Sequence, residues 1–544
     1  MEPHSTLVIR VRGDLSERQP LGGLNSFFKV GQSVRSVVES LRKAKVDSRI
    51  SGVIIAPSGS QKLWGKIQEI RDAVIDFRES GKPIVAYLEY GGEQGYYIAT
   101  ATNRIYLMPT STLHLTGLAT YEVFLRGVFD NIDAYPDMLH VGEYKTAANR
   151  YTEKTFTPAH REMSESLNHD LYEQLISGIA SGRQISETQV RAFLDKGPFL
   201  PEDAVRVNLV DELAYEDEIY DKVSAAESDQ QTIIEDSDYR MVSLSSLGLN
   251  KGPRIAVIYV SGVIASGESK FDLTGAQVVG SETLINSIRS VRDDKSIRAI
   301  VLRIDSPGGS ALASDAIWRE LVITREKKPI IASMSDLAAS GGYYIAMPAH
   351  AIVAQPATLT GSIGIVMGKI IFAGTYEKLG VNIESVSDGR YAEIYSPIRR
   401  FSDEERSKIE QQMSTFYDRF VEKVAQARKT TAGRIDKVAQ GRVWTGRQAQ
   451  QLGLVDDLGG LDRALMLAKE RAGISLDEEI ELIFYPRQKN LFELVSASLA
   501  GGSARMPVPL AWASKYQGLN ALIASLDLFR RGEPLALMPH VFLR

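Results

Sequence analysis

Residues 328–346 read KPIIASMSDLAASGGYYIA, and residues 82–99 read KPIVAYLEYGGEQGYYIA. Both segments begin with Lys-Pro and an apolar run, and both end with Gly-Tyr-Tyr-Ile-Ala. Further matches follow at a constant offset, such as Pro109 with Pro356 and Gly117 with Gly364. Self-similarity at a long, fixed period indicates that the chain is a tandem duplication of one folding unit.

The duplication and the composition together divide the chain of 544 residues into four parts. A stretch rich in Ser, Asp and Gln separates the two units and is typical of a linker. The last part is apolar over residues 491–499 and 510–529, which we expect to pack against the body or a neighbouring subunit, or to touch a membrane. The predicted parts are a first unit at 1–224, a linker at 225–253, a second unit at 254–480 and a C-terminal extension at 481–544.

The second unit alternates short runs of Ile and Val with amphipathic segments. Residues 311–325 carry apolar side chains at helical spacing behind Ser310, a suitable N-cap, and predict a helix. The other predicted elements are strands at 255–260, 299–304, 329–334 and 351–354 and a short helix at 341–346. This alternation predicts βαβ units around a largely parallel sheet, so we expect both units to share one α/β fold.

The composition is that of a globular protein and excludes several kinds of site. Without a cysteine, the chain has no thiol nucleophile, disulfide or thiolate metal site. A net charge of −5 without a long block of like charges argues against a nucleic-acid surface. The nucleotide-binding and His-Glu-x-x-His motifs do not occur, so we expect neither a cofactor nor a metal. No apolar run is long enough for a spanning helix, and Met1-Glu2-Pro3-His4 lacks the layout of a signal peptide.

The two units differ at a turn between a strand and a helix. The second unit reads Asp-Ser-Pro-Gly-Gly-Ser at 305–310, whereas the first reads Ile-Ala-Pro-Ser-Gly-Ser at 55–60. Gly308 and Gly309 allow positive φ angles and leave their amide N–H groups uncovered. Such a turn suits the binding of an anion or of a developing oxyanion.

Two further differences concern reactive side chains. Ser340 lies at a strand-to-helix turn among small residues, and Glu93 occupies the matching place in the first unit. Conversely, Lys145 of the first unit aligns with Ala392 of the second. A serine needs a base to act as a nucleophile, and a lysine that burial keeps neutral can supply it. This division of polar side chains between the units predicts one divided active site.

At these positions the sequence resembles the S49 serine peptidases in their long tandem form, the signal peptide peptidases of type A. Each motif is weak alone, but five in the same order across a duplication are specific together. The motifs are Asp305–Gly309, Ala339–Tyr344, Thr360–Gly364, Gly142–Lys145 and Gly441–Gly446.

The resemblance implies a crotonase/Clp-protease-like fold and a serine endopeptidase that degrades short apolar peptides such as cleaved signal peptides. It also implies a homotetramer at the bacterial inner membrane, with the catalytic part facing the periplasm. It assigns roles to six residues: Ser340 as nucleophile, Lys145 as general base, the amides of Gly308, Gly309 and Gly341 as oxyanion donors, and Ser362 as a hydrogen-bond partner of the lysine.

Two other functions remain open at this point. A crotonase-type acyl-CoA enzyme would use a carboxylate base, for which Glu93 and Glu393 lie at or beside the divided positions. A catalytically silent scaffold that binds peptides is the second alternative. His350 and His140 are the histidines nearest to the candidate residues, although no Gly-x-Ser-x-Gly elbow surrounds the serine.

Overall fold

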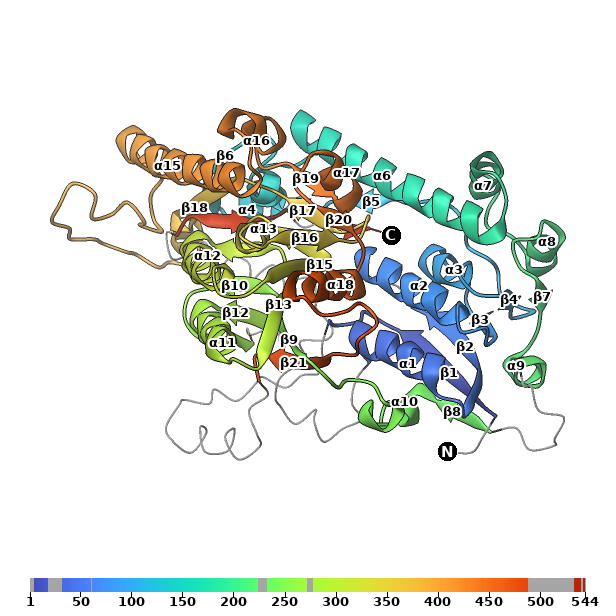
Figure 1. Cartoon of the computed structure of the whole chain (residues 1–544). Helices are drawn as coiled ribbons and strands as arrows, with labels where there is room; N and C mark the ends of the chain where they lie inside the picture. Colours follow the sequence, from blue (N-terminus) through green and yellow to red (C-terminus); the bar gives the residue numbers. More distant parts are fainter. Residues whose placement is uncertain are drawn as a thin grey trace.

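The computed structural model describes residues 4–17, 32–59, 61–223, 232–271, 277–487, 533–539 and 542–543 (Figure 1). The apolar segments 491–499 and 510–529 of the extension lie outside these residues. Figure 1 shows two α/β bodies side by side, with the first unit in blue and teal and the second in green to orange. No helix of the described part is long and apolar enough to cross a membrane.

The first unit is built on a parallel six-stranded sheet with the order β7-β4-β3-β2-β1-β8. Its strands are nearly continuous runs of buried Ile, Val and Leu, as expected when helices cover both faces of a parallel sheet. The strands are β1 (Ser5–Arg12), β2 (Ile50–Ser58), β3 (Ile84–Leu88), β4 (Arg104–Leu107), β7 (Glu212–Leu213) and β8 (Ile233–Glu235). The main helices are α1 (Val34–Val46), α2 (Gly65–Arg78), α3 (Glu93–Ala99) and α6 (Pro158–Arg183).

The second unit repeats this plan with the order β19-β17-β15-β13-β9-β21, and β16 lies between β15 and β20. All of its pairings are parallel except that of β17 with β19. The strands are β9 (Arg254–Ser261), β13 (Ile297–Ser306), β15 (Ile330–Ala339), β16 (Ala351–Ala354), β17 (Leu359–Gly361), β19 (Val443–Thr445), β20 (Asp457–Leu458) and β21 (Glu481–Tyr485). The helices are α11 (Ser281–Asp293), α12 (Ala311–Arg325), α13 (Gly341–Ala346), α15 (Asp403–Ala427), α16 (Ala432–Val438), α17 (Gly446–Gln451) and α18 (Leu461–Ala472).

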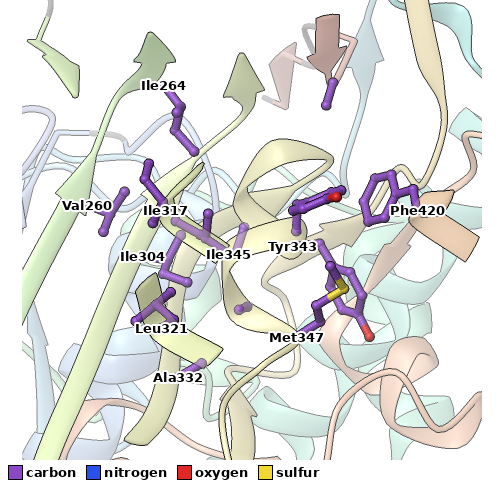
Figure 2. Close-up of a cluster of buried hydrophobic side chains, with 14 of the residues drawn as sticks. Val260, Ile264, Ile304, Ile317, Leu321, Ala332, Tyr343, Ile345, Met347 and Phe420 are labelled. Atoms are coloured by element: carbon purple, nitrogen blue, oxygen red, sulfur yellow. The ribbon is translucent and has the colours of Figure 1, made fainter. Parts of the chain in front are cut away.

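The predicted helices at 311–325 and 341–346 and the predicted strand at 351–354 have the bounds expected from the sequence. The Ser310 hydroxyl accepts the N–H of Ala313 and caps α12 as predicted. Figure 2 shows Ile317 and Leu321 of this helix within the buried cluster that also contains Ile304 of β13. The strand predicted at 329–334 is longer, because β15 continues to Ala339 and pairs there with β17.

A third sheet joins the two units, with the order β11-β12-β10-β14-β22-β18-β6. Its members from the second unit are β10 (Val263–Ala265), β11 (Lys270–Phe271), β12 (Gln277–Gly280), β14 (Gly308–Ser310) and β18 (Ile365–Ile371). The first unit contributes β6 (Tyr135–Val141), and the extension contributes β22 (Leu535–Leu537). The antiparallel pairing of β6 with β18 runs over seven residue pairs and fixes the first unit on the second.

The remaining elements are short and lie around these sheets. They are β5 (Thr120–Tyr121), α4 (Arg126–Asn131), α5 (Asn149–Thr152), α7 (Glu187–Leu194), α8 (Pro201–Arg206), α9 (Glu216–Val223), α10 (Asp236–Tyr239), α14 (Ala373–Lys378) and β23 (Phe542–Leu543).

Matching tyrosines show the duplication in the structure. The Tyr343 hydroxyl donates to the carbonyl of Leu454 at 2.9 Å, and the Tyr96 hydroxyl donates to the carbonyl of Leu209 at 2.7 Å. Both rings are buried at the start of the short helix that follows the central strands. The Gly-Tyr-Tyr motif therefore packs and anchors this helix in each unit.

Candidate active site

Ser340 connects β15 to α13 in a strained conformation. Its φ is +56° and its ψ is −110°, and its N–H donates to the carbonyl of Gly361 at 2.7 Å. A positive φ at a non-glycine residue typically costs about 1–3 kcal/mol and is common at functional sites. The side chain makes no capping hydrogen bond to α13 although it occupies the N-cap position. It is therefore available to another partner.

Lys145 lies on a tight turn after β6. Its N–H donates to the carbonyl of Gly142 at 3.1 Å, and the neighbouring Tyr144 N–H donates to Gln440 of the second unit at 2.8 Å. A Cβ atom at Gly441 would lie 2.5 Å from the Cα of Lys145, so only glycine fits there. Contacts from both units thus hold the backbone that carries the lysine.

The lysine side chain of the first unit meets the serine of the second. Lys145 Nζ lies 2.8 Å from Ser340 Oγ, 2.9 Å from the carbonyl oxygen of Ser362 and 3.0 Å from Ser362 Oγ. All three residues have an exposed fraction of 0%. The structure thus brings together the serine and lysine that the sequence places almost two hundred residues apart, and it places Ser362 where the resemblance implies.

Burial alone lowers the pKa of Lys145 well below its ordinary value. In the part of the chain that the structure describes, no carboxylate forms an ion pair with this lysine that would favour its charged form. A neutral amine has two N–H groups and one lone pair. The two N–H groups match the two oxygens of Ser362, which leaves the lone pair directed at the Ser340 hydroxyl.

The glycine turn lies beside this pair of side chains. Gly308 has a φ of +97° and Gly309 a φ of +151°. A Cβ atom at Gly308 would lie 2.6 Å from the Gly341 nitrogen and would overlap the carbonyl oxygen of Ala536. The Gly308 N–H donates to Ser306 Oγ at 3.2 Å in this structure. The missing side chain at Gly308 therefore lets the carbonyl oxygen of Ala536 approach closely beside the Gly341 amide.

Strand β22 of the extension fills the groove between β14 and β18. Leu535, Ala536 and Leu537 pair antiparallel with Ser310, Gly309 and Gly308, in that order. Backbone hydrogen bonds from Ala311 N–H to Pro534 and from Met538 N–H to Pro307 extend this pairing at both ends. This strand was not predicted from the sequence. Its only local signal is the run Leu-Ala-Leu-Met between two prolines at 534–539, which bounds a short strand.

The histidines have structural roles. His350 Nδ1 accepts the N–H of Ile330 at 3.1 Å, just as the Asn103 side chain accepts the N–H of Ile84 at 2.9 Å in the first unit. His140 Nδ1 lies 3.0 Å from the carbonyl oxygen of Gly142 and is exposed. No described histidine contacts the serine or the lysine.

The candidate carboxylates also have other partners. Glu93 accepts the N–H and the hydroxyl of Thr116, each at 3.0 Å. Glu393 forms an ion pair with Arg399 at 3.1 Å. Neither carboxylate lies beside the glycine turn, where an acyl-CoA enzyme would need its base.

Comparison with known families identifies the family of the chain. A sequence model of peptidase family S49 matches residues 76–230 and 323–475. The chain belongs to peptidase family S49. This S49 peptidase is a serine peptidase, and the two matched regions confirm the tandem α/β arrangement expected from the duplication.

Two named relatives align with most of the chain of this S49 peptidase. It is 36% identical over 485 residues to "Serine protease SPPA, chloroplastic" of Arabidopsis thaliana, covering 88% of this chain and 71% of the relative. It is 33% identical over 511 residues to "Protease 4" of Salmonella typhi, covering 89% of this chain and 80% of the relative. A solved structure of a mutant 1510-N membrane-bound stomatin-specific protease with a substrate peptide matches 45% of this chain and 96% of its own, at 15% identity and a TM-score of 0.28.

Proposed function

We propose that this S49 peptidase cleaves peptide bonds with Ser340 as nucleophile and Lys145 as general base. The observation that carries the proposal is the 2.8 Å contact between two fully buried side chains that belong to different units. The lowered pKa of Lys145 supports it, because only the neutral amine accepts a proton.

The reaction then follows from these two groups. Ser340 Oγ attacks the scissile carbonyl carbon while Lys145 Nζ takes the hydroxyl proton, and the lysine returns this proton to the leaving amine as the C–N bond breaks. A water molecule next gives a proton to the same amine and attacks the acyl-enzyme carbonyl. The lysine returns this proton to Ser340 Oγ as the ester C–O bond breaks, which releases the acid and restores both side chains. The dyad supplies both nucleophile and proton acceptor, so this scheme uses no cofactor and no metal.

The developing oxyanion would be held by backbone amides of the Gly308-Gly309 turn and of Gly341. Support comes from the carbonyl of Ala536, which already lies against Gly308 next to the Gly341 nitrogen. Aligned amides in a site without water stabilise the charge that forms in the transition state. The Gly308 N–H would exchange its bond to Ser306 for one to the substrate.

The substrates in this proposal are extended apolar peptides, such as cleaved signal peptides. The position of β22 supports an extended backbone, because it pairs with β14 and with β18 at once. Apolar side chains line the groove: Leu535 and Leu537 pack in one cluster with Ala147, Val366 and Ile370. The choice of cleaved signal peptides comes from the resemblance to signal peptide peptidases.

The same proposal assigns a role to each part of the chain. The first unit at 1–224 supplies the lysine, and the second at 254–480 supplies the serine and the glycine turn. Residues 225–253 link them and also contribute β8 to the sheet of the first unit, and the extension at 481–544 supplies β21 to the sheet of the second unit as well as β22. For location, we propose the bacterial inner membrane with the catalytic part facing the periplasm, on the resemblance alone; fractionation of cells that express the full chain tests it.

A second copy of the chain is the proposed partner, in a homotetramer. Residues 379–399 are the second unit's counterpart of the segment that carries β6 and the lysine, and they project from the body in Figure 1. Leu379, Val381, Ile383 and Val386 are exposed there, and Val386 is fully exposed. Pairing of this segment with residues 118–124 of another copy would repeat the β6–β18 contact between chains, and such head-to-tail contacts close into rings.

Light scattering after size exclusion tests the assembly. Ile383→Asp combined with Val386→Asp should reduce the mass to that of one chain, whereas Leu476→Asp, at a residue about as exposed as Ile383, should not. A wild-type protein with the mass of one chain at micromolar concentration would overturn the proposed tetramer and leave the catalytic proposal intact.

Hydrolysis of a quenched fluorescent peptide rich in Leu and Ala tests the catalytic proposal. Wild type should cleave it, whereas Ser340→Ala and Lys145→Met should lose at least about 1000-fold in kcat. Ser246→Ala and Lys62→Met are matched controls, because both side chains are exposed and distant in sequence from the site. Equal turnover by wild type and Ser340→Ala would refute the assignment, and no reaction with a serine-directed covalent probe would favour a silent scaffold.

A further inference from the structure

Lys66 of the first unit is buried against the strands that carry the site of the second unit. It lies on the first turn of α2, and its exposed fraction is 6%. Its Nζ lies 2.8 Å from Asp305 Oδ2 and 3.3 Å from Asp336 Oδ2, and its backbone N–H donates to Asp336 Oδ1 at 2.8 Å. One lysine of one unit thus bridges two aspartates of the other.

The two aspartates precede the two halves of the site. Asp305 lies near the end of β13, three residues before Gly308, and Asp336 lies in β15, four residues before Ser340. The pairing of β13 with β15 is irregular between Ile304 and Ser306, where the register shifts. The regular hydrogen-bond ladder is therefore interrupted at the level where both strands approach the site, and the lysine bridge lies next to this interruption.

The close approach of α2 makes the bridge possible. A Cβ atom at Gly65 would lie 2.8 Å from the carbonyl oxygen of Ser335 and 3.0 Å from the Cα of Asp336. Glycine at this position lets the first turn of the helix touch β15 directly. Lys66 then reaches both carboxylates with a side chain that is buried between the units.

The bridge places one cation and two carboxylates together in a buried position. Burial raises the pKa of Asp305 to about 6 and raises that of Asp336, while the charge of Lys66 acts in the opposite direction on both. Without the lysine, two buried carboxylates would face each other with no cation between them. Such a pair moves apart or takes up protons. Either response would alter the position of the strand ends.

We propose that Lys66 is a positioning residue that holds the Gly308-Gly309 turn and Ser340 in the relative position needed to stabilise the oxyanion. This inference rests on the catalytic function proposed above. In this proposal the first unit has two roles. Lys145 accepts the proton, and Lys66 aligns the strands of the second unit. Lys66 does not touch the substrate.

A neighbouring ionic cluster, whose Glu17 also interacts electrostatically with Lys66, should keep the two units together when Lys66 is changed. Arg303 of β13 donates to Glu17 at 2.7 Å and to Glu69 at 2.6 Å, and all three side chains are buried. Loss of the Lys66 bridge therefore affects the alignment of the strand ends more than the docking of the units.

Lys66→Met tests the inference against Lys43→Met as a matched control. Lys43 is another buried lysine of the first unit, and its Nζ donates to the carbonyl oxygens of Tyr239, Arg240 and Val242 instead of bridging carboxylates near the site. We expect Lys66→Met to lower kcat by about 10- to 100-fold, the effect of a small misplacement of reacting groups, with KM changed less than about 3-fold. Lys43→Met should lower the melting temperature and leave kcat within about 2-fold of wild type.

A peptide boronate separates the possible outcomes, because it forms a tetrahedral adduct with the serine. Its affinity should fall in Lys66→Met by the same factor as kcat/KM, while binding of the uncleaved peptide in the Ser340→Ala background stays unchanged. If Lys66→Met does not fold, Asp336→Asn carries the same expectation, since its amide oxygen still accepts the Lys66 N–H. Boronate affinity and kcat equal to wild type would overturn the inference. Boronate binding that survives Ser340→Ala would instead overturn the proposed function.

Discussion

Ser362→Ala removes one of the two groups that orient the lysine and leaves the other. The hydroxyl lies 3.0 Å from Lys145 Nζ, whereas the carbonyl oxygen of the same residue lies 2.9 Å away and belongs to the backbone. The N–H of Ser362 donates to the carbonyl of Arg442 at 2.7 Å, which holds the backbone at its φ of +51°. Alanine should therefore keep the carbonyl in place and delete a single hydrogen bond.

The expected loss follows from that single bond. A typical hydrogen bond contributes about 0.5–1.5 kcal/mol net, and each 1.36 kcal/mol corresponds to about a tenfold change in rate. We expect kcat of Ser362→Ala to fall by about 2- to 13-fold, with KM nearly unchanged because the hydroxyl faces the lysine. Lys145→Met, which removes the proton acceptor itself, should lose at least about 1000-fold.

Steady-state kinetics with the quenched peptide measure this difference. The four proteins to compare are wild type, Ser362→Ala, Lys145→Met and Ser340→Ala, at one pH and with thermal melting recorded for each. A loss in Ser362→Ala as large as that in Lys145→Met would refute the reasoning, because it would mean that the hydroxyl itself carries the proton. An unchanged kcat would show that the carbonyl alone orients the amine.

Three further predictions concern charge, the first unit and the extension. Because burial lowers the pKa of Lys145 and the protonated amine cannot accept a proton, kcat/KM measured from pH 5 to 9 should rise with pH, and a flat profile would contradict a lysine base. Glu93→Ala should change kcat less than about 2-fold, because its carboxylate binds Thr116 away from the glycine turn; a loss beyond about 10-fold would revive a carboxylate base. Deletion of residues 534–544 should lower KM several-fold with kcat unchanged, since β22 occupies the groove that a peptide strand needs; a raised KM or a failure to fold would instead make β22 part of the stable sheet.

The sequence predicted the elements whose signals are local. Ala311–Arg325 could be placed to the residue because Ser310 caps it and its apolar side chains repeat at helical spacing. The strand that ends at Ala339 was predicted too short, because Ser333, Ser335 and Asp336 interrupt its apolar run. These polar residues are buried in the structure since Arg303, Glu17 and Lys66 bind them there, and such partners cannot be read from the strand itself.

The serine and the lysine were predictable for a different reason. The duplication provides a second copy in which each position carries a different side chain, so Ser340 stands out against Glu93 and Lys145 against Ala392. No such contrast exists for β22, which has no counterpart in the first unit and lies far along the chain from β14. Nor does it exist for Lys66, whose role depends on how α2 of one unit meets β15 of the other.

The seven-residue pairing of β6 with β18 lies within one polypeptide, and it has a kinetic consequence. Two groups held on one folded chain meet as an intramolecular pair, with an effective concentration that does not depend on how much protein is present. Specific activity per chain should therefore stay constant on dilution, even under conditions where copies of the chain separate. An enzyme whose catalytic lysine belongs to a neighbouring subunit would instead lose activity as its subunits dissociate.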